Sequence, residues 1–163
     1  MIAAFCPYCG AKLTKKEIGD EGLVPYCENC QKPIFPMPCP CAIILCINKD
    51  NEVVLIKQSY GYSGYVLVAG YLQIGETFEE CVKREVKEEL NLNATNISYI
   101  GSYFQKSKEN IMTAYACNVN GDIVLSGEVS EASFVKLEDA PSLLKDASIA
   151  QNVVMDFLKK VND

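Results

Sequence analysis

The chain has 163 residues, of which 49% are apolar and 22% charged, which is typical of one globular domain with or without a small satellite. No stretch approaches the roughly 20 consecutive apolar residues of a membrane-spanning helix, and no signal peptide is visible at the start, so we expect a cytoplasmic protein with no membrane contact. The net charge of −6 disfavours nucleic-acid partners, and the absence of histidine excludes Ser-His and Cys-His nucleophilic pairs.

Two Cys-x-x-Cys pairs lie near the start of the chain. Cys6 and Cys9 form the first pair, Cys27 and Cys30 form the second, and 17 residues separate the pairs. This spacing is typical of tetrahedral zinc sites, in which each tight turn directs two sulfurs at one ion. Because four thiolates leave no open coordination position, the zinc is expected to be structural. We therefore predict a zinc ribbon over residues 1–35, with two disulfides or free thiols as the alternative.

Four prolines follow the ribbon within eight residues, which predicts an extended connector because proline fixes φ and lacks a backbone donor. We place the domain boundary at residues 35–38, so that a second domain covers 38–163. The prolines are Pro33, Pro36, Pro38 and Pro40.

The remaining five cysteines fall in strand or helix patterns, where a free cysteine packs as a small apolar residue. Packing is the predicted role for all five, and Cys39 and Cys41 are close enough in sequence to raise a redox alternative. They are Cys39, Cys41, Cys46, Cys81 and Cys117.

The pattern of apolar residues after the connector predicts a mixed α/β domain. Runs rich in β-branched residues predict strands, and a polar turn separates the first two of them. Two other segments repeat apolar residues at intervals of three and four, which predicts helices. The predicted strands are 42–47, 52–58, 65–69, 97–105, 111–119 and 132–137, and the predicted helices are 78–90 and 149–161.

The first predicted helix has clear start and stop signals and an acidic stripe. Thr77 with Glu80 forms a capping box, and Asn91 stands where a left-handed C-cap residue is expected. Within the helix, residues 85, 88 and 89 are glutamates that share one face. Like charges at this spacing repel, and a divalent cation held by hard oxygen ligands reverses that interaction. The spacing alone favours an ordinary solvated acidic face over a metal site.

A longer pattern favours the metal site. Gly70, five residues, Glu76, seven residues and the run Arg-Glu-Val-Lys-Glu-Glu-Leu-Asn-Leu at 84–92 resemble the Nudix box, Gly-x5-Glu-x7-Arg-Glu-U-x-Glu-Glu-x-Gly-U, where U is aliphatic. Every fixed position matches except the last glycine, which is Asn91 here. Asparagine is the residue that best replaces glycine at a left-handed helix end.

The Nudix resemblance implies an α/β/α sandwich around a mixed sheet and hydrolysis of a nucleoside diphosphate linked to another moiety. Carried over to this chain, it makes Glu85 and Glu89 direct ligands of Mg²⁺ or Mn²⁺, and Glu88 a ligand or water-mediated base. The cation would bridge the pyrophosphate oxygens, neutralise developing charge and lower the pKa of the attacking water.

The Nudix resemblance also implies roles for the loop before the helix. Gly70 and Gly75 let the backbone bend close to the substrate phosphates. Glu76 is expected to pair with Arg84 and so to hold the loop on the helix.

A four-cysteine ribbon directly before a Nudix domain resembles the NADH pyrophosphatase branch of the family, from about residue 5 to 158. Residues 127–134 resemble the Glu-U-x-Glu-Ala-x-Trp-Phe segment of that branch, whose first glutamate joins the metal site, so Glu128 is a fourth candidate ligand. An exposed acid at a strand edge is the alternative. The run Ser-Ile-Ala at 148–150 resembles the branch's Ser-Ile-Ala before its last helix, which makes Ala150 a candidate substrate contact.

The branch motif Ser-Gln-Pro-Trp-Pro-Phe-Pro-x-Ser is missing, because the aligned stretch 102–110 keeps only Ser102. Without these prolines and the tryptophan, the resemblance implies the chemistry but no preference for NADH. Tyr103 or Phe104 can stack on a base, and burial in the core is the alternative for both.

Three functions stay open on the sequence. The first is metal-dependent hydrolysis of a pyrophosphate such as NAD(H), ADP-ribose or FAD, and the second is removal of an NAD or other 5′ cap from RNA. The ribbon has four bases and four acids in residues 1–35, and this near-neutral charge gives little support to RNA binding. The third is a catalytically silent nucleotide-sensing or protein-binding module, against which the intact acidic stripe argues. A homodimer is implied by the resemblance alone.

Overall fold

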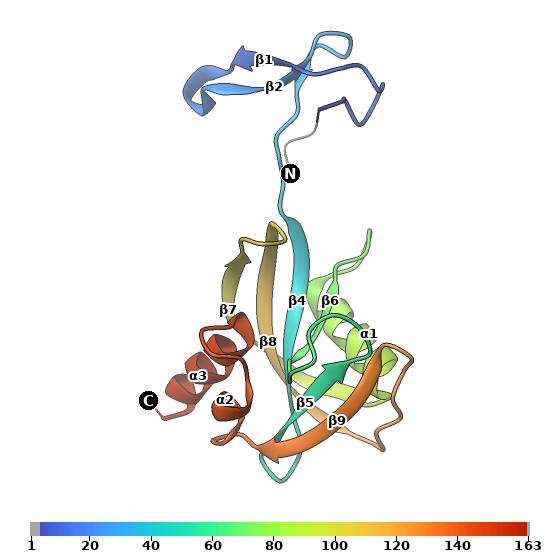
Figure 1. The fold of residues 1–163 in the computed structure, drawn as a ribbon, viewed down its shortest axis with the longest axis vertical. Helices are drawn as coiled ribbons and strands as arrows, with labels where there is room; N and C mark the ends of the chain where they lie inside the picture. The colour runs from blue at the N-terminus through green and yellow to red at the C-terminus, as the bar shows by residue number, and fades with distance from the viewer. Residues whose placement is uncertain (1–3, 163) are drawn as a thin grey trace. The chain divides into compact units, whose positions relative to one another are not determined.

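The computed structural model describes residues 4–162 (Figure 1). They divide into two compact units, one ending at Pro38 and the other beginning at Cys39. The first residues of the predicted ribbon, 1–3, and the last residue of the predicted second domain lie outside the described residues. No helix in the described part of the chain is long and apolar enough to cross a membrane.

The N-terminal unit is a small antiparallel sheet in the strand order β1-β2-β3, and Figure 1 labels its first two strands. A short 3-10 turn joins its first two strands. The sequence pattern predicted no strand here, because runs of two to five residues rich in charge carry no readable periodicity. The strands are β1 (Thr14–Glu17), β2 (Leu23–Cys27) and β3 (Lys32–Pro33).

Very little of this unit is buried. Among its described residues, the side chains less than a tenth exposed are those of Cys6, Val24, Tyr26 and Cys27. Two of these four are predicted zinc ligands. The unit therefore has almost no apolar core apart from its cysteines.

The second unit is built on a six-stranded mixed sheet. Five strands follow the order β7-β8-β4-β5-β9, and β6 pairs with β4 beside that path. Strand β4 is parallel to β8 and antiparallel to β5 and β6. The strands are β4 (Cys39–Ile47), β5 (Glu52–Gln58), β6 (Val68–Tyr71), β7 (Asn93–Gln105), β8 (Asn110–Asn120) and β9 (Val129–Lys136), and the helices are α1 (Phe78–Leu90), α2 (Ala140–Leu143) and α3 (Ile149–Asn162).

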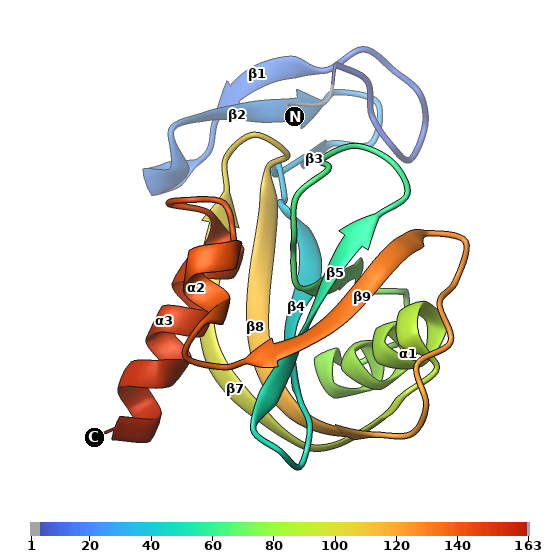
Figure 2. The same ribbon diagram turned by 60° about the horizontal axis from the view of Figure 1, so that its bottom comes forward.

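Alternating side chains of β4 contribute to two separate cores. Leu45 belongs to a cluster that includes Val153 of α3, whereas Ile44 belongs to a cluster that includes Val86 of α1. Since successive side chains of a strand point to opposite faces, α1 and α3 cover opposite faces of the sheet (Figure 2). The predicted α/β/α sandwich around a mixed sheet is confirmed.

The ends of α1 are those that the sequence predicted. The Thr77 side chain accepts a hydrogen bond from the Glu80 backbone N–H, and the Glu80 carboxylate accepts one from the Thr77 N–H. Asn91 adopts the left-handed conformation, with φ of 59°, and donates its N–H to the carbonyl oxygen of Lys87. Local side-chain chemistry therefore sets the length of the helix that carries the glutamates.

One predicted strand is shifted along the chain. The prediction was 65–69, but β6 begins at Val68, and Val66 makes only an isolated bridge with Ile56. Tyr65 makes a second isolated bridge, with Leu144. At these residues the chain stops pairing with β5 and begins to pair with β4. Alternation of apolar residues does not indicate which strand a segment pairs with, so it could not predict this change.

The proline-rich connector is shorter than predicted. Pro33 ends β3, and Pro40 is the second residue of β4, so only 34–38 lie outside strands. Proline is tolerated near a strand end, where few ladder hydrogen bonds are lost.

Candidate active site and metal centres

The acidic face of α1 has a buried part and an exposed part. Glu85 and Glu89 are 9% and 6% exposed among apolar side chains. The side chain of Glu88 is 59% exposed and points away from that core. Burial of two carboxylates costs free energy unless their charges are neutralised or bound.

Arg84 is the centre of an ion-pair network on this helix. Its guanidinium donates to both carboxylate oxygens of Glu76, at 2.7 and 2.9 Å. It also donates to Glu85 and, at 3.1 Å, to Glu88, and it donates to the carbonyl oxygen of Tyr71 at 3.0 Å. The hydrogen bonds from Arg84 lower the pKa of Glu76 to about 2, so the loop stays tied to the helix by an ionised carboxylate. The sequence predicted the pair with Glu76, but not the contacts with the other two glutamates.

Gly70 leaves the space that the carboxylate of Glu85 occupies. A β-carbon built on Gly70 would lie 1.8 Å from both Cδ and Oε1 of Glu85, far inside contact distance. Burial raises the pKa of this carboxyl, and Arg84 opposes the shift. The sequence predicted a close approach to Gly70 by substrate phosphates, and the structure adds a close approach by a helix side chain.

Glu89 is the buried acid without a counterion. Among the described side chains, its Oε2 is the only buried polar atom with no hydrogen-bond partner. Burial, and then the charges of Glu85, Glu128 and Glu88, raise its pKa to about 8. An unpartnered buried carboxylate oxygen beside other carboxylates fits a divalent cation, because oxygen ligands and negative charge are what Mg²⁺ and Mn²⁺ require.

Glu128 enters the site from the loop before β9. Its charge contributes to the raised pKa of Glu89, which places it within electrostatic reach of that buried acid. Two backbone hydrogen bonds hold the loop: Ser126 N–H donates to the Glu89 carbonyl at 3.2 Å, and Ser59 N–H donates to the Glu128 carbonyl at 2.8 Å. The tertiary fold thus brings this acid toward α1 from almost 40 residues along the chain.

The four glutamates do not form a tight ligand cage of their own. In residues 4–162, the only group of three or more acidic or cysteine ligand atoms within 4.8 Å of one another consists of cysteine sulfurs. Glu85 and Glu88 instead face the guanidinium of Arg84, which offsets part of their charge. The site is therefore a group of neighbouring carboxylates with the guanidinium of Arg84 beside two of them.

A shallow hollow lies at the start of α1, beside Arg84. Gly75, with φ of 87°, makes the turn that leads from the loop into the helix. The hollow combines two cationic side chains with carboxylates, and its lining residues are Gln73, Ile74, Gly75, Glu76, Glu80, Lys83 and Arg84.

The other predicted substrate contacts are not grouped with the acidic helix. Tyr103 packs against the cluster under α3 and donates its hydroxyl hydrogen to Asp156 at 2.8 Å. Ala150, at the start of α3, belongs to the same cluster. Phe104 is the following residue of β7 and is 57% exposed. Tyr103 thus has a packing role, and Phe104 is the more accessible of the two aromatic candidates.

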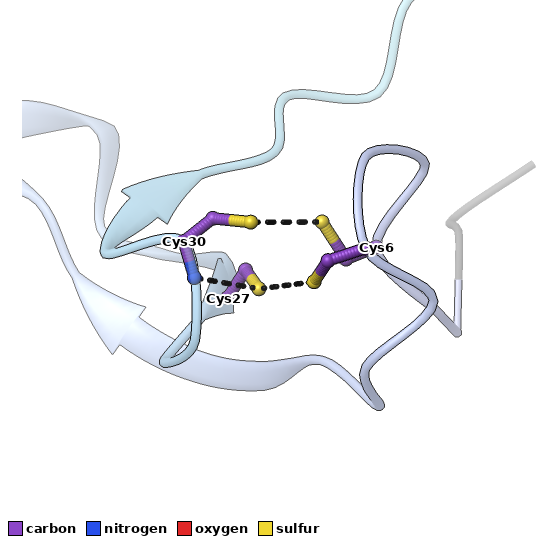
Figure 3. A group of neighbouring side chains, drawn as sticks. Cys6, Cys27 and Cys30 are labelled. Atoms are coloured by element: carbon purple, nitrogen blue, oxygen red, sulfur yellow. Dashed lines mark hydrogen bonds between the residues drawn. The ribbon is translucent and has the colours of Figure 1, made fainter.

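The four cysteines of the N-terminal unit come together as the spacing predicted (Figure 3). The sulfurs of Cys6 and Cys30 lie 3.9 Å apart, and those of Cys9 and Cys27 lie 3.5 Å apart. A tetrahedron with zinc–sulfur bonds of about 2.3 Å requires sulfurs about 3.8 Å apart, whereas a disulfide requires about 2.05 Å. A hydrogen bond from Asn29 and other local donors lower the pKa of the Cys9 thiol to about 6, whereas the hydrogen bond with Cys9 raises the pKa of the Cys30 thiol to about 12, so the pair shares one proton when no ion is bound. The sulfurs therefore fit one tetrahedral ion and not two disulfides.

The remaining cysteines are free, and four of these five are buried. Cys46 and Cys117 are neighbours on the paired strands β4 and β8, with sulfurs 4.0 Å apart. Cys81 contacts the carbonyl oxygens of Gly70 and Tyr71. These four pack as small apolar residues, as predicted.

Sequence comparison gives the chain clear relatives. The NUDIX domain family matches residues 37–157. The chain is 30% identical to the NAD-capped RNA hydrolase NudC of Vibrio atlanticus (strain LGP32) over 97% of its own length and 60% of that protein. It is also 30% identical to the NAD-capped RNA hydrolase NudC of Escherichia coli (strain K12 / DH10B), over 93% of its length and 59% of that protein. The chain thus spans about three-fifths of the length of these relatives.

Solved structures support the same fold. A NUDIX hydrolase from Nitrosomonas europaea matches with a TM-score of 0.76 at 16% identity, covering 98% of this chain and 93% of that one. The MutT protein from Methanosarcina mazei Go1 matches with a TM-score of 0.64 at 21% identity, covering 80% of this chain and 100% of that one. At such low identity these matches establish the fold alone.

Proposed function

Since this chain belongs to the Nudix hydrolase family, we propose that it hydrolyses the pyrophosphate bond of a nucleoside diphosphate linked to another moiety. NAD(H), ADP-ribose and similar dinucleotides are the substrates of first choice. The observation that carries the proposal is the buried, unpartnered oxygen of Glu89 within the Nudix box. Burying such an oxygen costs folding free energy, which a helix with no binding role has no reason to bear. A metal-dependent phosphate site, in contrast, requires an oxygen of this kind as a ligand.

The residues proposed to hold Mg²⁺ or Mn²⁺ are Glu85, Glu89 and Glu128, and Glu88 acts either as a fourth ligand or as the base. When bound, the cation supplies positive charge to the phosphate oxygens and lowers the pKa of a nearby water. The water oxygen attacks one phosphorus and the bond to the bridging oxygen breaks, which gives two monophosphates. Exposed Glu88 is suited to accept the proton that the water releases, either directly or through a second water.

The other residues of the box act on these acids and on the substrate. Arg84 ties Glu76 and its loop to α1 and sets the orientation of Glu85 through a further hydrogen bond. Gly70 leaves room for that carboxylate and for close approach of the phosphates. Lys83 and Arg84 bring positive charge to the hollow beside the loop, where a polyphosphate anion is favoured.

The N-terminal unit is proposed to be a zinc ribbon over residues 1–35, followed by the hydrolase domain over 38–163. Its four sulfurs leave no open coordination position, which supports a structural ion. Assembly into a homodimer is proposed from the family resemblance, and light scattering of the purified protein tests it.

Removal of an NAD cap from RNA is a second candidate function. It is favoured by the two relatives that match 93–97% of the chain, because both are named NAD-capped RNA hydrolases. The charge of −6 opposes it, because RNA binding gains most of its affinity from basic side chains. A silent nucleotide-sensing module is a weaker candidate, because a site without catalysis has no need of mutually repelling acids.

A substrate panel tests these candidates together. ADP-ribose, NADH, FAD and NAD-capped RNA are incubated with the protein and Mg²⁺ or Mn²⁺, and the products are identified by mass. We expect metal-dependent release of mononucleotides from at least one free pyrophosphate. Cleavage of capped RNA alone would favour the second function, and binding without cleavage of any substrate would favour the sensor.

A further inference from the structure

The loop at 59–64, between β5 and β6, reaches the candidate metal site although it is outside the Nudix box. Its first residue, Ser59, donates its N–H to the carbonyl oxygen of Glu128 at 2.8 Å. The next residue, Tyr60, places its hydroxyl 3.5 Å from Oε2 of the same glutamate, at the outer limit of a hydrogen bond. Backbone and side chain of this loop therefore both contact the residue proposed as the fourth ligand.

The side chain of Tyr60 lies on the side of the loop that faces Glu128, because its hydroxyl approaches that carboxylate. Tyr60 is nevertheless 61% exposed. A side chain this exposed contributes little to packing, so its position next to Glu128 calls for another explanation.

Tyr62 of the same loop has a different environment. Its hydroxyl lies over Gly64, where a β-carbon would come within 2.4 Å of it, and the ammonium of Lys145 lies 5.8 Å from its ring centroid. Tyr62 thus supports the fold of the loop, whereas Tyr60 faces Glu128. Tyr60 is therefore the residue to test, and Tyr62 is its control.

We propose that the exposed ring of Tyr60 is the surface on which the base of the nucleotide substrate stacks. The proposal rests on the proposed function, since it places an aromatic platform beside Glu128, one of the acids that would hold the cation. A flat base and a phenol ring attract each other through stacking, and the 3.5 Å approach to Glu128 leaves the ring uncovered. The loop would thus supply an aromatic wall in a chain that lacks the tryptophan and prolines of the related branch.

Kinetics and binding of three variants test this role. For ADP-ribose with Mg²⁺, Tyr60→Ala is expected to raise KM about tenfold with kcat changed less than about twofold. Tyr60→Phe keeps the ring and is expected to keep KM, and Tyr62→Ala is expected to leave KM near that of the unmodified protein. Calorimetry with the methylene-bridged analogue of ADP-ribose, which cannot be cleaved, is expected to give the same order for Kd.

Two results would overturn the stacking role. One is an active protein whose Tyr60→Ala variant keeps the original KM and Kd. The other is a Tyr60→Phe variant as impaired as Tyr60→Ala, which would show that the hydroxyl and not the ring is needed. If the unmodified protein neither binds the analogue nor cleaves any pyrophosphate, the proposed function fails, and the role of Tyr60 fails with it.

Discussion

The four cysteines and the acidic residues of α1 are two sets of proposed metal ligands supported by very different amounts of protein. The cysteine unit buries few side chains, and Cys6 and Cys27 are among them. The acidic helix instead lies on a six-stranded sheet with an apolar cluster on each face. In the first unit two of the four buried side chains among the described residues are proposed ligands, whereas in the second an independent apolar core holds the proposed ligands.

The two sets also differ in how their charge is offset. The four sulfurs converge within 4.8 Å of one another and contact each other in pairs. In the second unit, Arg84 offsets Glu85 and Glu88, and among the buried side chains of the described residues only Glu89 is left with an unpartnered oxygen. We therefore expect loss of metal to unfold the first unit and to leave the second folded but inactive.

The largest expected effect is on the N-terminal unit after zinc removal or the substitution Cys27→Ser. Zinc binding in small modules contributes about 10 kcal/mol of folding free energy, far more than this unit can gain from two buried apolar side chains. Hydrogen exchange followed by mass spectrometry is expected to show loss of protection in β1 to β3 and unchanged protection in β4 and α1. The matched control is Cys39→Ser, an exposed cysteine outside the cluster. Unchanged protection of β2 after chelation would remove the structural role of the ion.

The substitution Glu89→Gln is expected to lower turnover by about two to four orders of magnitude with the fold intact. The amide keeps the size of the side chain but loses the charge that holds a cation. Turnover of ADP-ribose at saturating Mg²⁺ and the circular dichroism spectrum are the measurements. Glu79→Gln, an exposed acid on the same helix, is the control and is expected to change neither. Equal turnover in both variants would take Glu89 out of the mechanism.

The substitution Gly70→Ala is expected to lower turnover about 10- to 100-fold, because the new methyl group displaces the carboxylate of Glu85. The same change at Gly127, where a β-carbon meets nothing within 4 Å, is the control. Steady-state kinetics and a crystal structure of the alanine variant check the displacement. A variant with full activity would show that the position of Glu85 in the present structure is irrelevant to catalysis.

The pH dependence of stability tests the buried charge of Glu89. Its pKa rises from 4.5 to about 8 on folding, so the folded protein holds a proton that the unfolded chain releases between these values. The resulting loss of folding free energy is absent below about pH 4.5 and complete above about pH 8, where the difference between the two pKa values corresponds to roughly 5 kcal/mol. Without divalent cations in the buffer, Glu89→Gln should therefore gain Tm relative to the original protein as the pH rises from 5 to 8. A constant Tm difference would show that Glu89 keeps its ordinary pKa.

The smallest expected effect concerns Asn91, where this chain departs from the glycine of the box. Glycine adopts φ near 59° without strain, so Asn91→Gly is expected to stabilise the protein by about 0.5 kcal/mol. Asn91→Ala is expected to destabilise it by about 1 kcal/mol, because a β-carbon is strained in this conformation and alanine cannot compensate by local hydrogen bonds. Thermal unfolding of the two variants should shift in opposite directions.

Much of the fold and part of the site could be predicted from short stretches of sequence. The capping box of Thr77 and Glu80 and the left-handed Asn91 depend on hydrogen bonds within one turn of helix, so they can be read locally. The cysteine spacing and the acidic stripe are likewise properties of single segments. Strand β6 was misplaced because its partner changes along the run, which depends on segments far away in the sequence.

The sequence by itself determined which ligand types are present, how they are spaced on one helix or one turn, and hence the class of chemistry. Only the tertiary structure decided that Glu89 keeps an unpartnered oxygen, that Gly70 accommodates Glu85, and that Tyr60 lies beside Glu128. The physical reason is that spacing along a helix follows from backbone geometry, whereas burial and charge balance depend on every segment packed around a side chain. Side chains 15 to 68 residues apart meet here only because the sheet brings their strands and loops together.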